Sequence, residues 1–311
     1  MQEFLQQLIN GLSIGSIYAL IAVGYTMVYG ILQLINFAHG DVFMVGALLT
    51  LIIARKFGFF VPPHVVESLP AFLLCATLAI LCCAVLGLVI ERFAYRPLRN
   101  RPRINSLITA IGVSLLLEFG AQHQAVFGPT PQPFPTPMIP WVEQSLFSSS
   151  GLRISRIDAL ILITTLVLML ALTFIVLRTK IGLALRAVSY RFDIAALMGI
   201  NIDLVISFTF VLGSALAGAA GVLYAIKYPS VNPLMGLLPG VKAFVAAVFG
   251  GIGNIAGAVC GALLLGLVEV FVVGYLPNGS QYRDGVAFVV LIAILLVKPS
   301  GLLGKNVTEK V

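Results

Sequence analysis

Residues 4–38, FLQQLINGLSIGSIYALIAVGYTMVYGILQLINFA, contain no Asp, Glu, Lys or Arg. A bilayer accepts a helix where about 20 residues pass without an unpaired charge, so this stretch is long enough to cross one. Further charge-free runs lie at residues 68–90, 159–177, 204–226 and 243–268, and shorter ones at 42–54, 104–117 and 285–297. The runs are continuous rather than alternating, which favours helices over a β-barrel. We predict an all-α, polytopic transmembrane bundle of about eight or nine spans, forming a single domain over residues 1–311.

The composition excludes a soluble protein. The 311 residues are 59% hydrophobic and 10% charged, and the mean hydropathy is +1.06, whereas soluble domains carry about 25% charged residues. The net charge of +7 does not indicate nucleic-acid binding, because the basic residues lie at the ends of the apolar runs. No phosphate-binding loop, metal-binding motif or nucleophile motif occurs, so we expect neither an enzyme nor a cofactor or metal site.

Clusters of basic residues predict the orientation in the membrane. Positively charged loops stay on the cytoplasmic side, which places the following groups there: Arg92, Arg96, Arg99, Arg101 and Arg103; Arg178, Lys180, Arg186 and Arg191; Lys298, Lys305 and Lys310. One outward and one return span fit between the first two groups. The proline-rich residues 122–158 are therefore expected to form an extracytoplasmic loop.

The last third of the chain does not satisfy the positive-inside rule if each of its charge-free runs crosses the membrane once. Counting from a cytoplasmic 178–203 segment, three spans would leave the lysine-rich C-terminus outside. One solution is that residues 241–276 cross twice, with a break at the glycine-rich segment 250–254.

Few polar residues lie within the spans. Asn36, His39, Asp41 and Glu269 are the candidates for a substrate pathway, and a structural hydrogen bond is at least as good an explanation for each. The segment 36–41 interrupts an apolar stretch, as either a tight hairpin or a break within the membrane that exposes backbone groups to a cavity. Glu118 and Lys242 lie near span ends, where we expect them to reach the interface.

Two further sets of residues suggest contacts between helices or with other proteins. Gly253, Gly257 and Gly261 form two overlapping GxxxG steps, which allow close helix packing in lipid. Residues 178–203 are long enough for a short helix that lies along the cytoplasmic surface and docks into a groove of a soluble partner. A solvated connection is the alternative. The candidate docking residues of this segment are Gly182, Arg186, Asp193, Ala195 and Gly199.

Several motifs together resemble the integral membrane permease of branched-chain amino acid ABC importers. They are GYTMVYG at 24–30, INFAHG at 35–40, ERFAYRPLR at 91–99, the segment 182–201, GGIGN at 250–254 with Gly257, and KPSG at 298–301. The resemblance covers nearly the whole chain. It implies a bacterial cytoplasmic (inner) membrane protein with four kinds of neighbour: a second related permease, two cytoplasmic ATPases, an extracytoplasmic solute-binding protein and lipid.

The wider ABC importer family carries a coupling loop of the form EAAxxxG, which the cytoplasmic segment resembles. Asp193 stands where this pattern has Glu, and Ala195 and Gly199 match its second Ala and its Gly, whereas Ile194 and the missing downstream Pro depart from it. The resemblance implies that residues 178–203 couple to the ATPase. Two alternatives stay open: a permease for urea or short amides, and an ion-coupled secondary transporter that works alone.

Overall fold

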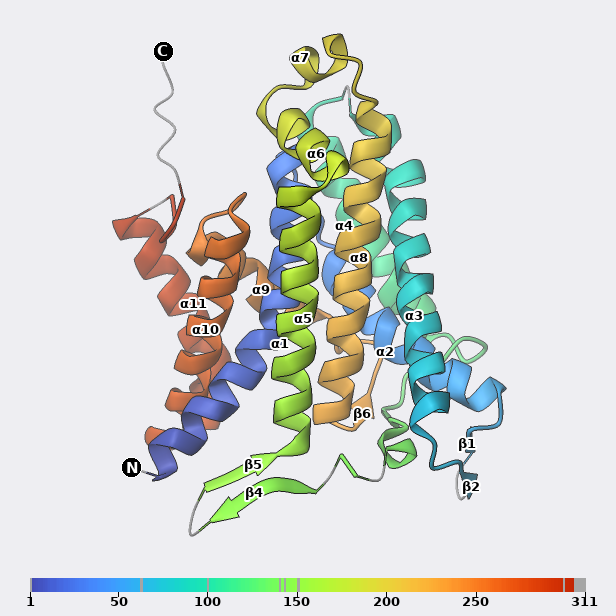
Figure 1. The fold of residues 1–311 in the computed structure, drawn as a ribbon, viewed down its shortest axis with the longest axis vertical. Helices are drawn as coiled ribbons and strands as arrows, with labels where there is room; N and C mark the ends of the chain where they lie inside the picture. Colours follow the sequence, from blue (N-terminus) through green and yellow to red (C-terminus); the bar gives the residue numbers. More distant parts are fainter. Residues whose placement is uncertain are drawn as a thin grey trace.

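The chain folds into a bundle of long helices that stand side by side (Figure 1). The computed structural model describes residues 2–61, 64–99, 101–139, 141–142, 144–149, 152–298 and 300–304. Its α-helices are α1 (Gln2–Leu32), α2 (His39–Lys56), α3 (Leu69–Ile90), α4 (Arg103–Gln122), α5 (Arg156–Arg178), α6 (Lys180–Tyr190), α7 (Phe192–Leu197), α8 (Ile202–Lys227), α9 (Leu237–Gly250), α10 (Ile255–Tyr275) and α11 (Gly279–Val297). A π-helical turn (Glu91–Tyr95) and a 3-10 turn (Arg96–Leu98) continue α3. The all-α prediction is confirmed.

Seven helices among the described residues are long and apolar enough to cross a membrane: α1, α3, α4, α5, α8, α10 and α11. Two further apolar helices, α2 and α9, are not among these seven. They have 18 and 14 residues. At 1.5 Å per residue, α9 is about 21 Å long, less than the roughly 30 Å of a hydrocarbon core. The expected eight or nine spans are reached only when these short helices are included.

Three short β-ladders and a 3-10 turn lie at the end of the bundle opposite to α6 and α7 (Figure 1). The ladders pair β1 (Phe60–Val61) with β2 (His64–Val65), β3 (Gln132–Pro133) with β6 (Ser230–Val231), and β4 (Ser145–Ser149) with β5 (Leu152–Ser155). The 3-10 turn spans Thr136–Met138. Below, this end is called the hairpin end, and the other the α6–α7 end. The proline-rich residues between α4 and α5 lie at the hairpin end.

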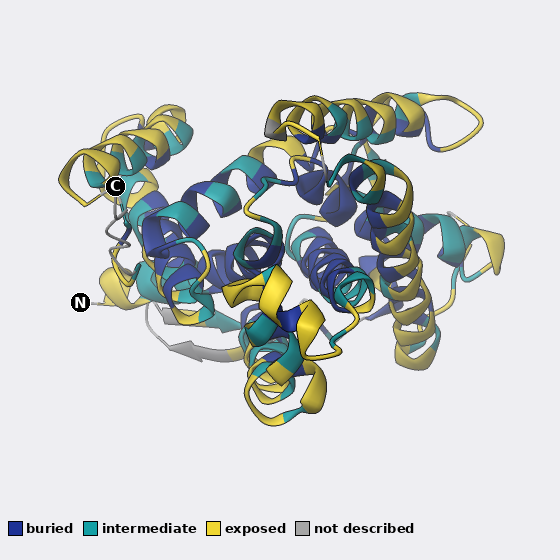
Figure 2. Ribbon diagram, turned by 90° about the horizontal axis from the view of Figure 1, so that it is seen from above, coloured by how far each residue is buried: buried dark blue, intermediate teal, exposed yellow. Residues whose placement is uncertain are grey.

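Helices α1 and α8 form the centre of the bundle. Of the most apolar 18-residue window, 89% of the residues are buried in α1 and 72% in α8, against 22% in α4 and 6% in α11. Figure 2 shows the same order, with buried residues in the middle and exposed residues on the outer helices. Apolar exposed faces need lipid or another membrane subunit as cover.

The two halves of the chain repeat one arrangement. Each has a long helix, a non-helical segment, a short helix and two more long helices, as α1 to α4 and as α8 to α11. In this repeat α8 corresponds to α1, and α10 corresponds to α3. Each half packs its first helix on the third helix of the other half: α1 packs most extensively on α10, and α8 on α3. The halves run in opposite directions, because α1 rises from the hairpin end and α8 descends towards it (Figure 1). This is the pattern of an inverted repeat, common in transporters.

The segment 241–276 is broken, as the sequence suggested. Helix α9 ends at Gly250 and α10 begins at Ile255, with Gly251 and Gly253 at positive φ in the turn between them. Residues after α11 pack on this turn, since Leu302 and Leu303 donate backbone hydrogen bonds to Phe249 and Gly250. Lys305 and Lys310 lie outside the described residues.

Candidate functional site

The short helices α2 and α9 both begin inside the bundle, where their first turns touch. A Cβ atom on Gly40 would lie 2.8 Å from the carbonyl oxygen of Gly236 and 2.9 Å from Cα of Gly240. Only glycines allow two backbones to approach so closely. We call this contact the α2–α9 crossing. Because residues 38–44 are buried, the segment 36–41 is a break within the bundle and not a hairpin at its surface.

Asn36 and His39 both pack into the interior, Asn36 with a hydrogen-bond partner and His39 with its Nε2 atom unpaired among the described residues. The side-chain oxygen of Asn36, which is buried, accepts a hydrogen bond of 3.0 Å from the Tyr95 hydroxyl. The His39 ring lies against Gly24 of α1, close to Gly213 of α8, so it fills the space where these central helices cross. Both residues therefore fix the broken segment to its neighbours.

Asp41 meets Glu118 at the interface of α2 and α4. The Asp41 carboxyl is within hydrogen-bonding reach of the Ser114 hydroxyl and the Glu118 carboxyl. Asp41 is 2% exposed and Glu118 6%, so the expectation that Glu118 reaches the interface is wrong: its side chain points towards α2. One oxygen of each carboxyl, Asp41 Oδ2 and Glu118 Oε1, has no hydrogen-bond partner among the described residues.

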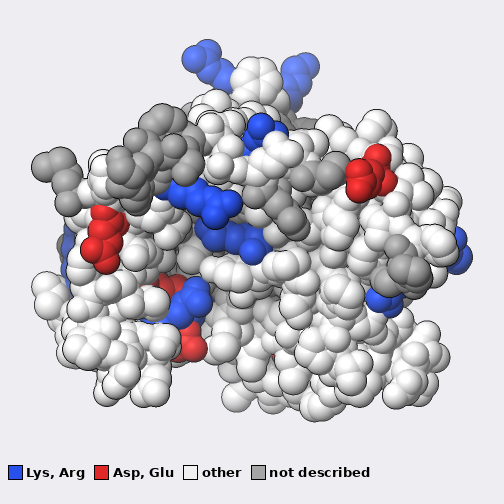
Figure 3. Space-filling view, turned by 90° about the horizontal axis from the view of Figure 1, so that it is seen from below, with Lys and Arg blue, Asp and Glu red and all other residues white. Residues whose placement is uncertain are grey.

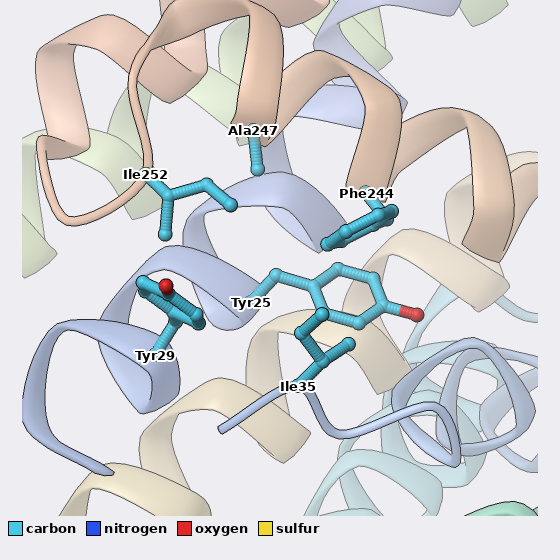
Figure 4. Close-up of a pocket in the computed structure, with 6 residues that line it drawn as sticks. All are labelled: Tyr25, Tyr29, Ile35, Phe244, Ala247 and Ile252. Carbon is cyan, nitrogen blue, oxygen red and sulfur yellow. The ribbon is translucent and has the colours of Figure 1, made fainter. Parts of the chain in front are cut away.

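A small apolar pocket lies beside the α2–α9 crossing (Figure 4). It is lined by Tyr25, Tyr29, Ile35, Phe244, Ala247 and Ile252. The Tyr25 ring packs edge-on against His39 at 4.7 Å and Phe244 at 5.9 Å between ring centres. The cavity measures about 10 Å³, room for roughly one water molecule. The pocket is closed to any amino acid in this conformation.

Glu269 is the centre of a buried charge network that joins four helices. It accepts hydrogen bonds from Tyr18 of α1 at 3.3 Å and from Lys242 of α9 at 3.0 Å, and it pairs with Arg283 of α11. Lys242 also pairs with Asp284 at 2.5 Å. The expectation that Lys242 reaches the interface is wrong, because its side chain is 5% exposed and bound by carboxylates on α10 and α11. Glu269 thus holds helices together in this conformation.

The glycines of α9 and α10 also lie together. A Cβ atom on Gly261 would meet the backbone of Ala246 and Gly250, and one on Gly257 would meet Gly250, so the two helices touch along this side. Gly253 is not part of the helical stripe, because it lies in the preceding turn at φ 93° with no neighbour within 4 Å of its Cβ position. Of the three glycines, Gly257 and Gly261 therefore form the helix-packing stripe on α10.

The segment 178–203 forms two short helices, α6 and α7, rather than one. Gly182 packs on carbonyl groups of α5, and Arg186 donates a hydrogen bond to the Val176 carbonyl, so both hold α6 on the end of α5. In α7, Ala195 is buried and Asp193 is exposed in the first turn. Gly199 has φ 80° and ends the helix, as glycine does in a left-handed C-terminal turn.

An ion-pair cluster next to α7 was missed by the sequence analysis. Asp203 at the start of α8 pairs with Arg96 and Arg99, and Arg99 also pairs with the buried Glu91. Glu91 accepts a second hydrogen bond of 2.7 Å from Ser207. The arginines of residues 91–99 indicate the membrane side and carry part of the family resemblance, but their partner Asp203 lies more than 100 residues away and could not be predicted from them. The cluster ties the end of α3 to the segment that carries α6 and α7.

No group of three or more His, Cys, Asp or Glu residues in the described parts of the chain is placed to hold a metal ion.

Comparisons with known proteins agree with this architecture. The family described as "Branched-chain amino acid transport system / permease component" matches residues 7–295. The chain is 43% identical over 315 residues to the high-affinity branched-chain amino acid transport system permease protein BraD of Pseudomonas aeruginosa, covering 99% of this chain and 98% of that protein. It is 43% identical to the permease protein LivH of Escherichia coli with the same coverage, and 29% identical to a probable LivH of Methanocaldococcus jannaschii over 93% of this chain and 89% of that protein.

These relatives are permease components and not enzymes. With seven membrane-length helices in the described residues, the chain is a multi-pass protein of the cytoplasmic (inner) membrane. It belongs to the family of permease components of branched-chain amino acid transport systems.

Proposed function

We propose that this chain is one of two membrane subunits of an ATP-driven importer of branched-chain amino acids. In the assembled importer it pairs with a second, related permease, binds cytoplasmic ATPases at the α6–α7 end and receives substrate from a solute-binding protein at the hairpin end. The family match and the names of its relatives, which are branched-chain amino acid permeases, support the substrate class. Seen from the hairpin end, much of the surface is uncharged, with a group of Lys and Arg side chains near its middle and separate Asp and Glu side chains around them (Figure 3).

The surface of α6 and α7 is the observation that carries this proposal. These helices project beyond the ends of α5 and α8 (Figure 1). Tyr190, Leu197 and Met198 are 86%, 87% and 77% exposed there. Large apolar side chains gathered on a projecting surface indicate a protein contact, and helices that present such a face dock into grooves. Arg178, Lys180 and Arg191 flank them, which by the positive-inside rule puts this surface in the cytoplasm.

The anchoring of this surface supports its role in coupling. Helix α6 is fixed to α5 through Gly182 and Arg186, and α8 is fixed to the end of α3 through Asp203. A displacement of α6 and α7 by an ATPase would therefore move α5, α8 and α3 together. Rigid movement of packed helices is an established means of switching a transporter between two states.

Helices α4 and α11 are the best candidates for the contact with the second permease. They occupy equivalent places in the two repeats, and α11 is the least buried of the long helices. Its exposed residues include Val289, Ile292 and Leu296. In a bilayer such an apolar face packs on another helix or on lipid. In an assembly of two related permeases, part of this face would contact the second permease and the rest would contact lipid.

The docking role is tested with the transporter co-expressed with its ATPases and binding protein. We expect Leu197→Glu, and separately Tyr190→Glu, to reach the membrane at the normal level, to lose the ATPase during purification and to abolish leucine uptake. Phe57→Glu is the matched control for retention of the ATPase, since Phe57 is 56% exposed at the opposite end of the bundle. If the α6–α7 variants retain the ATPase and transport leucine, this surface does not dock it.

Backbone geometry gives a second test of the same surface. Gly199→Val and Arg186→Glu should also abolish uptake while the protein still inserts, because the first places a β-branched residue at φ 80° and the second releases α6 from α5. Uptake of leucine, isoleucine and valine is compared with that of urea and acetamide. ATP-dependent uptake of urea or acetamide alone would assign the alternative substrate class. Accumulation without the ATPases would assign a secondary transporter.

A further inference from the structure

The Tyr25 hydroxyl occupies the point where α2 and α9 begin. It lies close to the backbone N–H of Gly40 in the first turn of α2. A Cβ atom on Gly240, in the first turn of α9, would lie 3.6 Å from the same hydroxyl. The positive ends of two helix dipoles, from helices of 18 and 14 residues, thus face one small volume. Such ends stabilise a negative charge, and a neutral hydroxyl is there now.

An unpaired carboxylate oxygen lies next to the same point. Asp41 follows Gly40 in the first turn of α2, and its carboxyl is close enough to the Tyr25 hydroxyl to interact with it electrostatically. Asp41 is 98% buried, and its Oδ2 atom has no hydrogen-bond partner among the described residues, while Ser114 and Glu118 of α4 lie within reach of the carboxyl. A buried polar atom without a partner is costly, and such an atom commonly marks a place where a ligand binds. An acceptor of this kind suits an ammonium group.

The apolar pocket also lies next to the Tyr25 hydroxyl, in addition to the two helix N-termini and Asp41. Tyr25 belongs both to the crossing and to the pocket, because its hydroxyl lies near Gly40 while its ring packs against His39 and Phe244. Figure 4 shows the Tyr25 ring beside Phe244 in the pocket. The remaining walls are aliphatic or aromatic. The free space of about 10 Å³ grows to the size of a side chain only if the Tyr25 ring leaves, since a tyrosine side chain is larger than that of leucine.

We propose that the α2–α9 crossing is a binding site for a zwitterionic aliphatic amino acid, which displaces the Tyr25 side chain. The carboxylate replaces the hydroxyl at the first turns of α2 and α9, the ammonium group faces Asp41, and the aliphatic side chain enters the pocket of Phe244, Ala247 and Ile252. This inference rests on the proposed import function and adds where the permease itself holds the substrate. Tyr25 closes the site when no substrate is present.

The arrangement fits an aliphatic amino acid better than other solutes. Urea and short amides carry no charge, so they would make no use of two helix dipoles and a buried carboxylate. A polar or charged side chain would lose its hydration in a pocket whose walls offer little to bond it. A branched aliphatic side chain loses nothing polar on entry and gains the burial of its apolar surface.

Changes in the pocket test the proposal through the ratio of substrates. Uptake of leucine, isoleucine and valine is measured with the complete transporter in proteoliposomes at saturating binding protein. Ala247→Val narrows the pocket and should lower the leucine-to-valine uptake ratio by about tenfold, the effect of a methylene group in a tight hydrophobic site. Phe244→Leu widens it and should shift the ratio towards leucine.

Two controls change buried residues of the same types elsewhere. Ala287 of α11 is 2% exposed, and Phe210 of α8 is 1% exposed. Ala287→Val and Phe210→Leu should scale uptake of all three amino acids equally. If the pocket variants also scale all three equally, the pocket does not touch the substrate, and the inference fails while the import function stands. If the unaltered transporter imports none of the three, the proposed function itself fails.

A direct measurement covers the case in which a variant does not fold. Photo-leucine, a diazirine analogue of leucine, is irradiated during turnover by the unaltered transporter, and the labelled peptides are identified. We expect label within residues 25–35 or 244–252, and we expect an Asp41→Asn variant to lose it. Label confined to other segments, or no label on this chain, would overturn the proposal.

Discussion

Replacing Gly40 by alanine should lower the stability of this chain through one contact. The added Cβ would lie 2.8 Å from the Gly236 carbonyl oxygen and 2.9 Å from Cα of Gly240. Both atoms belong to backbone, so no flexible side chain can move to make room. The first turns of α2 and α9 must therefore separate by about half an ångström, and overpacking of this kind costs about 1–3 kcal/mol.

The control for this substitution is a helical glycine with free space around it. Gly112 and Gly120 of α4 have no neighbour within 4 Å of their Cβ positions. Alanine is favoured over glycine in a helix by up to about 1 kcal/mol, so Gly112→Ala should be neutral or stabilising. The difference between the two substitutions isolates the packing cost. At about 2–4 °C per kcal/mol, we expect the Gly40→Ala midpoint to lie roughly 2–12 °C below that of Gly112→Ala.

The assay is thermal unfolding of the chain purified alone in detergent, followed by size-exclusion chromatography. The isolated chain is used because α4 is a candidate contact with the second permease. Gly240→Ala should lower the midpoint as Gly40→Ala does, and the double variant should lose less than the sum, since the first Cβ already separates the two backbones. Equal midpoints for Gly40→Ala and Gly112→Ala would refute the close contact between α2 and α9.

Three further predictions concern ion pairs. Lys242→Met and Glu269→Gln should each destabilise the isolated chain by up to about 3 kcal/mol, because each leaves the other charge with fewer partners inside the bundle; an unchanged midpoint of thermal unfolding would contradict the network. Asp203→Asn should leave membrane insertion and ATPase binding intact and reduce leucine uptake several-fold; the reasoning fails if uptake is normal. Lys227→Met should be less destabilising when Asp158 is also replaced by Asn, because the two are paired at 2.7 Å, and additive unfolding midpoints would show that the pair contributes nothing.

Part of the candidate site could be predicted because charge is rare in this chain. Asn36, His39, Asp41 and Glu269 stand out in an apolar sequence, and all four are buried. Their partners could not be predicted. Glu269 meets Lys242 of α9, 27 residues away, and Tyr18 of α1, 251 residues away, and nothing in the local sequence relates residues at such distances.

The aromatic and aliphatic members of the site gave no signal of a pocket, although Tyr25, Tyr29 and Ile35 lie in motifs that carry the family resemblance. Tyr25 and Phe244 are ordinary residues in a chain that is 59% hydrophobic, so composition cannot distinguish a pocket wall from a lipid-facing side chain. The glycines of the crossing are equally inconspicuous among 30 glycines. Their role follows only from which backbone each one touches.

The sequence by itself determined the solvent and the fold class, because the length and charge of each apolar run decide whether a helix can enter a bilayer. It also indicated a break at residues 250–254, and at residues 36–41 it left a hairpin and a break open. Only the tertiary structure decided that α2 and α9 start inside the bundle and touch, and that two halves of the chain pack as an inverted repeat. The physical reason is that membrane insertion depends on local hydropathy, which each segment carries alone, whereas helix packing depends on the shapes of surfaces that meet only after folding.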